Sequence, residues 1–420
     1  MPEQNDSGGG FSWLVNTISE KIVDNKIKKY NKCSEGREEY AVLATDILFP
    51  EESYQDNIIV SGGSIETRLR LSERLIRNCA TQGQSMVILH LANKGLEQIV
   101  SWHNWGLVAN KHNKKFDAFT SFKLPEIWQV VHETGRVKYA LKPAGRYIVQ
   151  IVFELLKCQK QRPYFSNYAN FNYHQIPERI KVCLANGLIT QDTADNLTSL
   201  LRMGQAECAK IDAFFYDAQA ALNHLATKNA NYTRGTSVLS AIRKGQIICL
   251  DLSASSNAML IELLVNSLTV AMNRGYRFSL FLDDVALANN EILKNALCQK
   301  SNHNNIICSQ DLYALLSGKD DMFTTITGEA QKTVLLSHGS HISCEKWSKY
   351  IGEYDKIEVT LYNSRSLNES GIRGFSVKAG KTMAKQRTYK IKPEEINRLA
   401  QGEIFMYDNE TGSLLHTNVG

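Results

Sequence analysis

The chain has 420 residues, of which 43% are hydrophobic and 22% are charged, so it can bury a large core and wholesale disorder is excluded. A net charge of +5 is too small to predict nucleic-acid binding from charge alone. The nine cysteines include no CxxC pair, which favours free thiols in a reducing compartment over zinc or disulfides. The polar start and the absence of a long apolar run predict a cytoplasmic protein, and we expect no metal site.

Residues 1–40 are predicted to form a leader and an amphipathic helix. Three glycines at 8–10 make the leader flexible, and lysines gather at the far end of the helix, at positions 26, 28, 29 and 32. The apolar positions at helical spacing are Phe11, Leu14, Val15, Ile18, Ile22 and Ile27. Two alternatives follow: the helix docks on its own domain, or it docks on a partner or an anionic membrane surface.

Residues 41–115 show the order of a βαβ unit. A β-branched strand at Asn57–Val60 leads into a glycine turn, a helix over Arg68–Thr81 and a second strand at Met86–Leu91. This order predicts the start of a parallel sheet.

Residues 116–241 lack strand runs and are predicted to form an inserted all-α domain. Proline at the first helical position supports three of its helix starts. The expected helices are Pro125–Thr134, Pro143–Leu156, Pro177–Asn186, Asp192–Met203 and Ala206–Leu225. The aromatic stretch Tyr164–Tyr173 is expected to pack in the core of this domain, with a partner surface as the alternative.

Residues 242–420 return to alternating strands and helices. Together with residues 41–115 they are predicted to form one discontinuous α/β domain, a doubly wound and mostly parallel sheet. The expected elements are strands at Gln246–Leu252, Phe278–Leu282, Asn305–Ser309, Thr333–Ser337 and Lys356–Tyr362, and a helix over Ala258–Arg274.

The glycine turn is a candidate nucleotide loop. A phosphate-binding loop reads GxxxxGK[ST] between a strand and a helix, with the lysine and the hydroxyl acting on phosphate and Mg²⁺. With Gly62 first and Gly63 following, Thr67 stands at the second glycine, Arg68 at the lysine and Leu69 at the Mg²⁺ ligand. This indicates either a degenerate nucleotide loop or a plain strand–helix turn.

Polar residues end two later strands. Asp283 and Asp284 follow an apolar strand, as the acids that hold Mg²⁺ and orient water do in P-loop ATPases, and Gln310 ends the next strand, where a γ-phosphate sensor would lie. We take these three residues as candidate catalytic residues.

In order and spacing, the chain resembles the FtsK/HerA class of ring-forming ATPases, and within it the TraD/TraG-like coupling proteins of type IV secretion and conjugation. The resemblance covers about residues 57–407 and implies a RecA-like fold with an inserted all-α domain. The segments that carry it are NIIVSGGSIETRLRLSERLI, HLANKG, SLFLDDVA, NIICSQDLYALL, WSKYIGEY and KPEEINRLAQGEIFMY. In HLANKG the family's acid is replaced by Ala92, whereas Lys94 and Gly95 are kept.

The resemblance implies ATP-driven DNA translocation or substrate delivery by a hexamer at the inner membrane. The chain departs from that pattern in its loop, in having Asp284 as the second acid and in lacking an amino-terminal transmembrane segment. We therefore expect a coupling-protein-like pseudo-ATPase, an adaptor in a secretion or transfer machine, with no cofactor unless the loop binds ATP and Mg²⁺. Its expected partners are protein components of that machine, in a homo- or hetero-oligomeric ring, with peripheral membrane association through partners or the N-terminal helix. The alternatives are an active DNA-translocating ATPase and a nucleic-acid-binding module.

A basic segment over Gly371–Lys392 could contact nucleic acid. It contains no acidic residue, and its glycines predict a loop; a flexible basic loop can contact phosphates. The candidate nucleic-acid-binding residues are Arg373, Lys378, Lys381, Lys385 and Arg387. A solvated basic loop without a ligand is the alternative.

Overall fold

The computed structural model describes residues 9–226, 235–253, 258–286, 294, 297, 303–366 and 376–419, with the side chains of 9–20 and 359–382 left aside. The chain divides into two compact units, Ala44–Thr333 and a second made of Met1–Leu43 with Val334–Gly420. Strand β8 (Lys332–Leu335) crosses this division. The three-part domain boundaries expected from the sequence stay a prediction.

The unit Ala44–Thr333 is built on a parallel sheet. Its six paired strands follow the order β2-β7-β6-β3-β5-β4, and every pairing between these neighbours is parallel. The strands are β2 (Ile58–Ser61), β3 (Met86–His90), β4 (Gly106–Ala109), β5 (Ile247–Asp251), β6 (Phe278–Asp283) and β7 (His303–Ser309). Strands β2, β3 and β6 are buried along their whole length, which explains their continuous apolar runs. Because the strands are parallel, their carboxyl ends meet at one edge.

Helices connect these strands. In α3, the residues Leu71, Leu75 and Ile76 are fully buried at helical spacing, whereas the charged residues Glu73 and Arg74 between them are half-buried. The connecting helices are α2 (Thr45–Leu48), α3 (Ile65–Thr81), α4 (Lys94–Trp102), α11 (Val238–Arg243), α12 (Ala258–Asn273), α14 (Leu312–Leu315) and α15 (Asp320–Gly328), with the 3₁₀ turn η1 (Glu51–Gln55). The predicted strands and helices are confirmed, except that α3 begins three residues earlier than expected; strand β4 and helices α2, α4, α11, α14 and α15 were not predicted.

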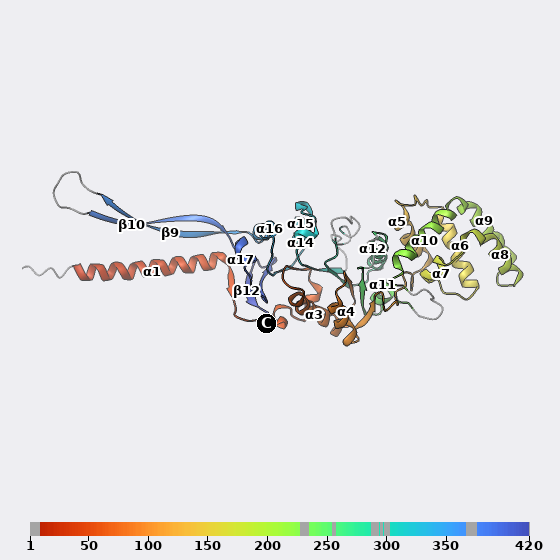
Figure 1. The fold of residues 1–420 in the computed structure, drawn as a ribbon, viewed down its shortest axis with the longest axis horizontal. Helices are drawn as coiled ribbons and strands as arrows, with labels where there is room; N and C mark the ends of the chain where they lie inside the picture. The colour runs from red at the N-terminus through yellow and green to blue at the C-terminus, as the bar shows by residue number, and fades with distance from the viewer. Residues whose placement is uncertain are drawn as a thin grey trace, which may run out of the picture. The chain divides into compact units, whose positions relative to one another are not determined.

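The described residues between β4 and β5 contain helices and no named strand, which confirms the helical character predicted for this stretch (Figure 1). The helices are α5 (Leu124–Gly135), α6 (Gly145–Cys158), α7 (Phe165–Ala169), α8 (Ile176–Ala185), α9 (Gln191–Gly204) and α10 (Cys208–Leu222). The aromatic stretch packs in their core, where the ring of Tyr168 stacks on that of Phe215 with centroids 5.4 Å apart. Core packing, the favoured interpretation of this stretch, is therefore confirmed.

The unit made of residues 1–43 and 334–420 contains the strands β1, β12 and β11, which pair in that order, and a separate hairpin, β9–β10. Helix α1 runs alongside the hairpin (Figure 1). The elements are α1 (Gly9–Glu35), β1 (Arg37–Glu39), α16 (His341–Ile351), β9 (Glu353–Ser366), β10 (Ser376–Tyr389), α17 (Pro393–Asn397), β11 (Glu403–Asp408) and β12 (Leu414–Asn418). The basic loop expected over Gly371–Lys392 is wrong for residues 376–389, because they form a strand paired with β9 in register.

Candidate functional site at the carboxyl edge of the parallel sheet

The turn between β2 and α3 is short. Gly62 and Gly63 adopt φ values of 100° and 67°, a left-handed backbone that favours glycine. Ser64 caps the helix, because its side chain accepts a hydrogen bond from the backbone N–H of Thr67 at 3.3 Å. Helix α3 therefore begins at Ile65, with only three residues between it and the end of β2.

This early helix start changes the environment of two predicted nucleotide-binding residues. In the GxxxxGK[ST] pattern, the residues up to the second glycine form an open loop whose N–H groups face phosphate. Here Thr67 and Arg68 lie within α3. The N–H of Thr67 donates a hydrogen bond to the side chain of Ser64, and the N–H of Arg68 donates to the backbone carbonyl of Ser64 at 3.1 Å. These two backbone donors are therefore used inside the protein.

The side chain of Arg68 folds back onto the turn. Its guanidinium donates to the carbonyl oxygens of Gly62 and Gly63 at 3.3 and 3.0 Å, and to the carboxylate of Asp284 at 3.0 Å. Arg68 is only 5% exposed. The positive charge that a phosphate would neutralise is thus already paired with an internal anion.

Asp284 joins the ends of two strands. Its backbone is left-handed, with φ of 53°, and its other carboxylate oxygen accepts the backbone N–H of Gln310 at 2.8 Å. The side chain of Gln310 itself is exposed. The structure therefore brings Arg68, Asp284 and Gln310 together, as their positions in the sequence predicted, although Gln310 takes part through its backbone.

Asp283 faces a different partner. Its carboxylate accepts a hydrogen bond from the side-chain amide of Asn93 at 2.8 Å, and the residue is 3% exposed. Burial raises the pKa of this carboxyl above its ordinary value. Asn93 also caps α4 by accepting the N–H of Leu96. Sequence reasoning missed Asn93, although its place just after a strand that ends beside β6 was a usable signal.

His90 is the second residue that was missed. It ends β3 in direct register with Asp251 on β5 and Asp283 on β6, and its ring accepts the backbone N–H of Asn93 at 3.0 Å. The residue is fully buried, and its Nε2 atom has no hydrogen bond to any described residue, with Glu97 at 3.8 Å. Burial lowers the pKa of His90 to about 4, despite the opposing effect of the Asp251 charge.

This low pKa predicts acid sensitivity. A histidine in the unfolded chain has a pKa of about 6.5, so between that value and about 4 the unfolded state binds more protons than the folded state. Stability contributed by neutral His90 is therefore lost as pH falls through this window. We expect wild type to lose about 2 to 3 kcal/mol more than His90→Gln between pH 7 and 4. Urea unfolding across this range checks the difference, and parallel pH profiles would contradict it.

Leu69, at the position of the Mg²⁺-binding hydroxyl, has a packing role. A Cβ added to Gly95 at the start of α4 would overlap the side chain of Leu69. Gly95 thus makes room for an apolar side chain that cannot bind a metal ion. This contact gives a structural reason for the glycine in HLANKG.

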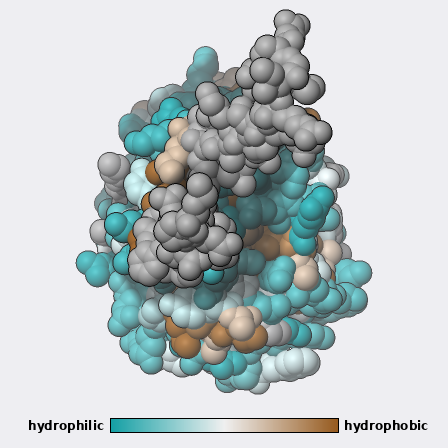
Figure 2. Space-filling model, turned by 90° about the vertical axis from the view of Figure 1, so that its left-hand side faces the viewer, coloured by the Kyte–Doolittle hydropathy of each residue, from teal (hydrophilic) through white to brown (hydrophobic). Residues whose placement is uncertain are grey.

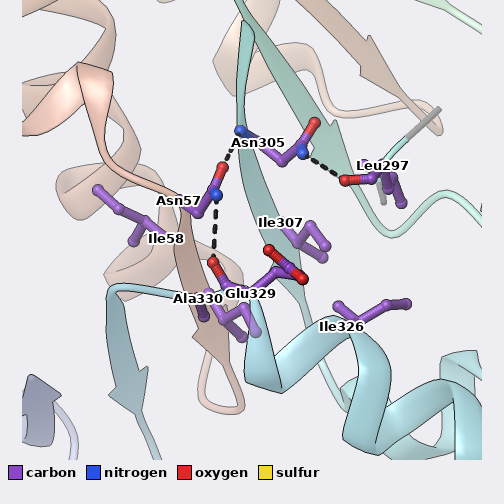
Figure 3. A pocket seen from close by; sticks show the side chains of 9 residues that line it. Asn57, Ile58, Leu297, Asn305, Ile307, Ile326, Glu329 and Ala330 are labelled. Atoms are coloured by element: carbon purple, nitrogen blue, oxygen red, sulfur yellow. Dashed lines mark hydrogen bonds between the residues drawn. The ribbon is translucent and has the colours of Figure 1, made fainter. Parts of the chain in front are cut away.

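A pocket lies elsewhere on the same unit, next to the amino halves of β2 and β7 (Figure 3). Asn57 joins its walls by accepting the N–H of Asn305 at 2.7 Å and by donating to the carbonyl of Glu329 at 3.1 Å. The lining is otherwise mostly apolar, including Ile58 and Ile307. Among the described residues, no Lys or Arg lines it.

The predicted nucleic-acid-binding residues are only partly described. Arg373 lies outside the described residues, as do the side chains of Lys378 and Lys381. Lys385 and Arg387 are exposed on β10, and Arg387 approaches the Glu353 carboxylate on β9 at 3.4 Å. An acidic residue of the paired strand thus lies near one of these cations, although the segment that carries the cations contains no acidic residue. Nucleic-acid binding by these residues remains a prediction.

Solved structures share this fold. The chain superposes on the bacterial conjugative coupling protein TrwBΔN70 in an unbound form with a TM-score of 0.54 and 14% identity, covering 94% of this chain and 91% of that chain. The complex of TrwB with the non-hydrolysable ATP analogue ADPNP gives 0.52 and 14%, covering 94% and 92%. Its complex with ADP and Mg²⁺ gives 0.50 with the same identity and coverage. No protein-family model and no curated protein matches the sequence.

This likeness defines the class of fold. The chain is an α/β protein with a RecA-like, mostly parallel sheet, as predicted. The predicted resemblance to TraD/TraG-like coupling proteins is confirmed by the match to a conjugative coupling protein over nearly the whole chain. At 14% identity it establishes the fold and leaves activity to be argued from the site.

Proposed function

We propose that this chain is a coupling-protein-like pseudo-ATPase that acts as a cytoplasmic adaptor or structural component of a type IV secretion or conjugative transfer machine. The fold shared with TrwB supports the class of machine. The main observation behind the proposed loss of activity concerns Arg68. Its guanidinium is hydrogen-bonded to Gly62, Gly63 and Asp284, at the place where nucleotide phosphates would need free donors. The proposed partners are protein components of the machine, including a ring assembly of this chain with itself or with related subunits.

Hydrolysis would require several of these contacts to break. The carboxylate of Asp284 would have to leave Arg68, and the N–H groups at the start of α3 would have to leave Ser64. Even then, Leu69 would supply no oxygen ligand for Mg²⁺. The acids Asp283 and Asp284, kept from the family pattern, therefore act here as structural partners of Asn93 and Arg68.

Calorimetric titration with Mg-ATP and Mg-ADP tests the proposal. We expect no binding heat at millimolar nucleotide with wild type, with Arg68→Ala, or with Arg77→Ala as a surface control on the same helix. Binding by wild type that Arg68→Ala weakens and Arg77→Ala leaves intact would overturn the proposal. That outcome would support the alternative of an active DNA-translocating ATPase with an atypical loop.

A further inference from the structure

Helix α1 and the β9–β10 hairpin form a basic arm. Together these three elements contain 11 basic and 6 acidic residues, a net charge of +5, which equals the net charge of the whole chain. The rest of the protein is therefore close to neutral. A concentration of one sign of charge on one element favours an anionic partner and disfavours a second copy of the same arm.

The helix is fixed to the hairpin along the edge of β9. The side chain of Asn31 donates to the carbonyl of Ile357 at 3.0 Å and accepts its N–H at 2.8 Å, so Asn31 pairs with the strand edge as a further strand would. Asp24, Ile27 and Ser34 are half-buried with Asn31 at helical spacing. These residues define the face of α1 that turns toward the hairpin.

The surface of α1 outside this face, over residues 22–33, mixes apolar and basic residues. Ile22, Val23 and Tyr30 are 50%, 37% and 40% exposed. Lys26 and Lys29 lie among them and are exposed, and neither forms an ion pair within the described part of the chain. The coloured surface in Figure 2 is mostly hydrophilic, with apolar residues in small groups, so such a stripe on a helix needs an explanation.

We propose that this surface of α1, residues 22–33, docks on an anionic lipid bilayer. Exposed apolar side chains enter the headgroup region, and the lysines beside them pair with lipid phosphates, as in helices that lie in the membrane interface. A nucleic acid would use the lysines and leave Ile22 and Val23 unexplained. In the part of the chain that is described, no helix is long and apolar enough to cross a bilayer. The inference is independent of the pseudo-ATPase proposal.

Vesicle flotation of the full chain tests this docking. We expect binding to phosphatidylcholine vesicles that contain phosphatidylglycerol, weaker binding in high salt and little binding to pure phosphatidylcholine. Replacing Lys26 and Lys29 with glutamine should lower partitioning into the vesicles about thirtyfold, because each lysine contributes about 1 kcal/mol to binding at an anionic surface. Ile22→Ser with Tyr30→Ser should lower it about tenfold or more.

Matched controls are exposed residues far along the chain: Val137→Ser for the apolar pair and Lys244→Gln for the lysines. Circular dichroism and a thermal melt confirm that each variant folds. Equal binding by the α1 variants and the controls would overturn the proposal, as would failure of wild type to float with anionic vesicles. Duplex DNA binding without vesicle binding would also overturn it and would make the arm a nucleic-acid contact.

Discussion

Asp284→Ala is expected to lower the free energy of unfolding by about 4 kcal/mol, because it leaves the buried guanidinium of Arg68 without its anion. The carboxylate of Asp284 is 35% exposed, which moderates the loss. Alanine must also adopt the left-handed backbone of this position, with φ of 53°, which adds to the cost. In an active ATPase the same acid would serve chemistry, so its removal would mainly affect turnover.

Denaturant unfolding measures this loss, and two companions separate its causes. Asp284→Asn tolerates the left-handed backbone, and its one side-chain oxygen can still accept the N–H of Gln310 while its amide faces the guanidinium of Arg68. Its smaller loss therefore reports the lost ion pair and the lost acceptor at Arg68 without the backbone strain. Adding Arg68→Met to Asp284→Ala removes the unpaired charge and should recover about 2 kcal/mol of the loss. Unchanged stability of Asp284→Ala would show that the Arg68 contact is not structural and would weaken the case for a blocked site.

Asp117→Ala is expected to destabilise the protein by about 3 kcal/mol, because the side chain organises the start of the helical region. Its carboxylate accepts the N–H of Phe119 at 3.0 Å, the hydroxyl of Thr120 at 3.1 Å and the N–H of Phe165 at 3.0 Å. Asp117 is 2% exposed, and burial raises the pKa of its carboxyl to about 6. Alanine would leave the N–H groups of Phe119 and Phe165 buried without an acceptor.

Thermal and urea unfolding compare Asp117→Ala with Asp192→Ala, an exposed acid in the first turn of α9 whose loss should cost a few tenths of a kcal/mol. Asp117→Asn should lie between them, because its carbonyl can still accept from Phe119 and Thr120 while its amide faces the Phe165 N–H. Equal stability of all the variants would show that the Phe119 and Phe165 donors find other acceptors.

Periodicity was enough to predict most elements of the fold. Strands β2, β3 and β5 are apolar up to their last residue, and β6 is interrupted before its closing acid only by Ser279, because both faces of a parallel sheet are covered. Strand β4 has only four residues and starts at Gly106, whose missing side chain allows close approach to the Ile247 backbone. Such a short run beginning with glycine carries little strand signal, so it was missed.

The hairpin shows why a local reading of charge failed. The only charged residues in 376–389 are cations, and Gly380 and several polar residues lie among them, a composition typical of a loop. They form a strand because β9 supplies fourteen paired residues, with Glu353, Asp355 and Glu358 among them. Pairing between residues this far apart is decided by the partner strand, and no pattern within β10 announces it.

At the site, the sequence alone determined which residues stand at the strand ends: Gly62 and Gly63 after β2, the two acids at the end of β6, and Gln310 after β7. Parallel strands bring their carboxyl ends together, so that proximity could be foreseen. The tertiary structure decided what these residues do there. The helix cap at Ser64 shortened the turn, Arg68 paired with Asp284, and Asn93 formed a hydrogen bond with Asp283. A buried charge or carboxyl must find a partner, and only the folded chain determines which partner is within reach.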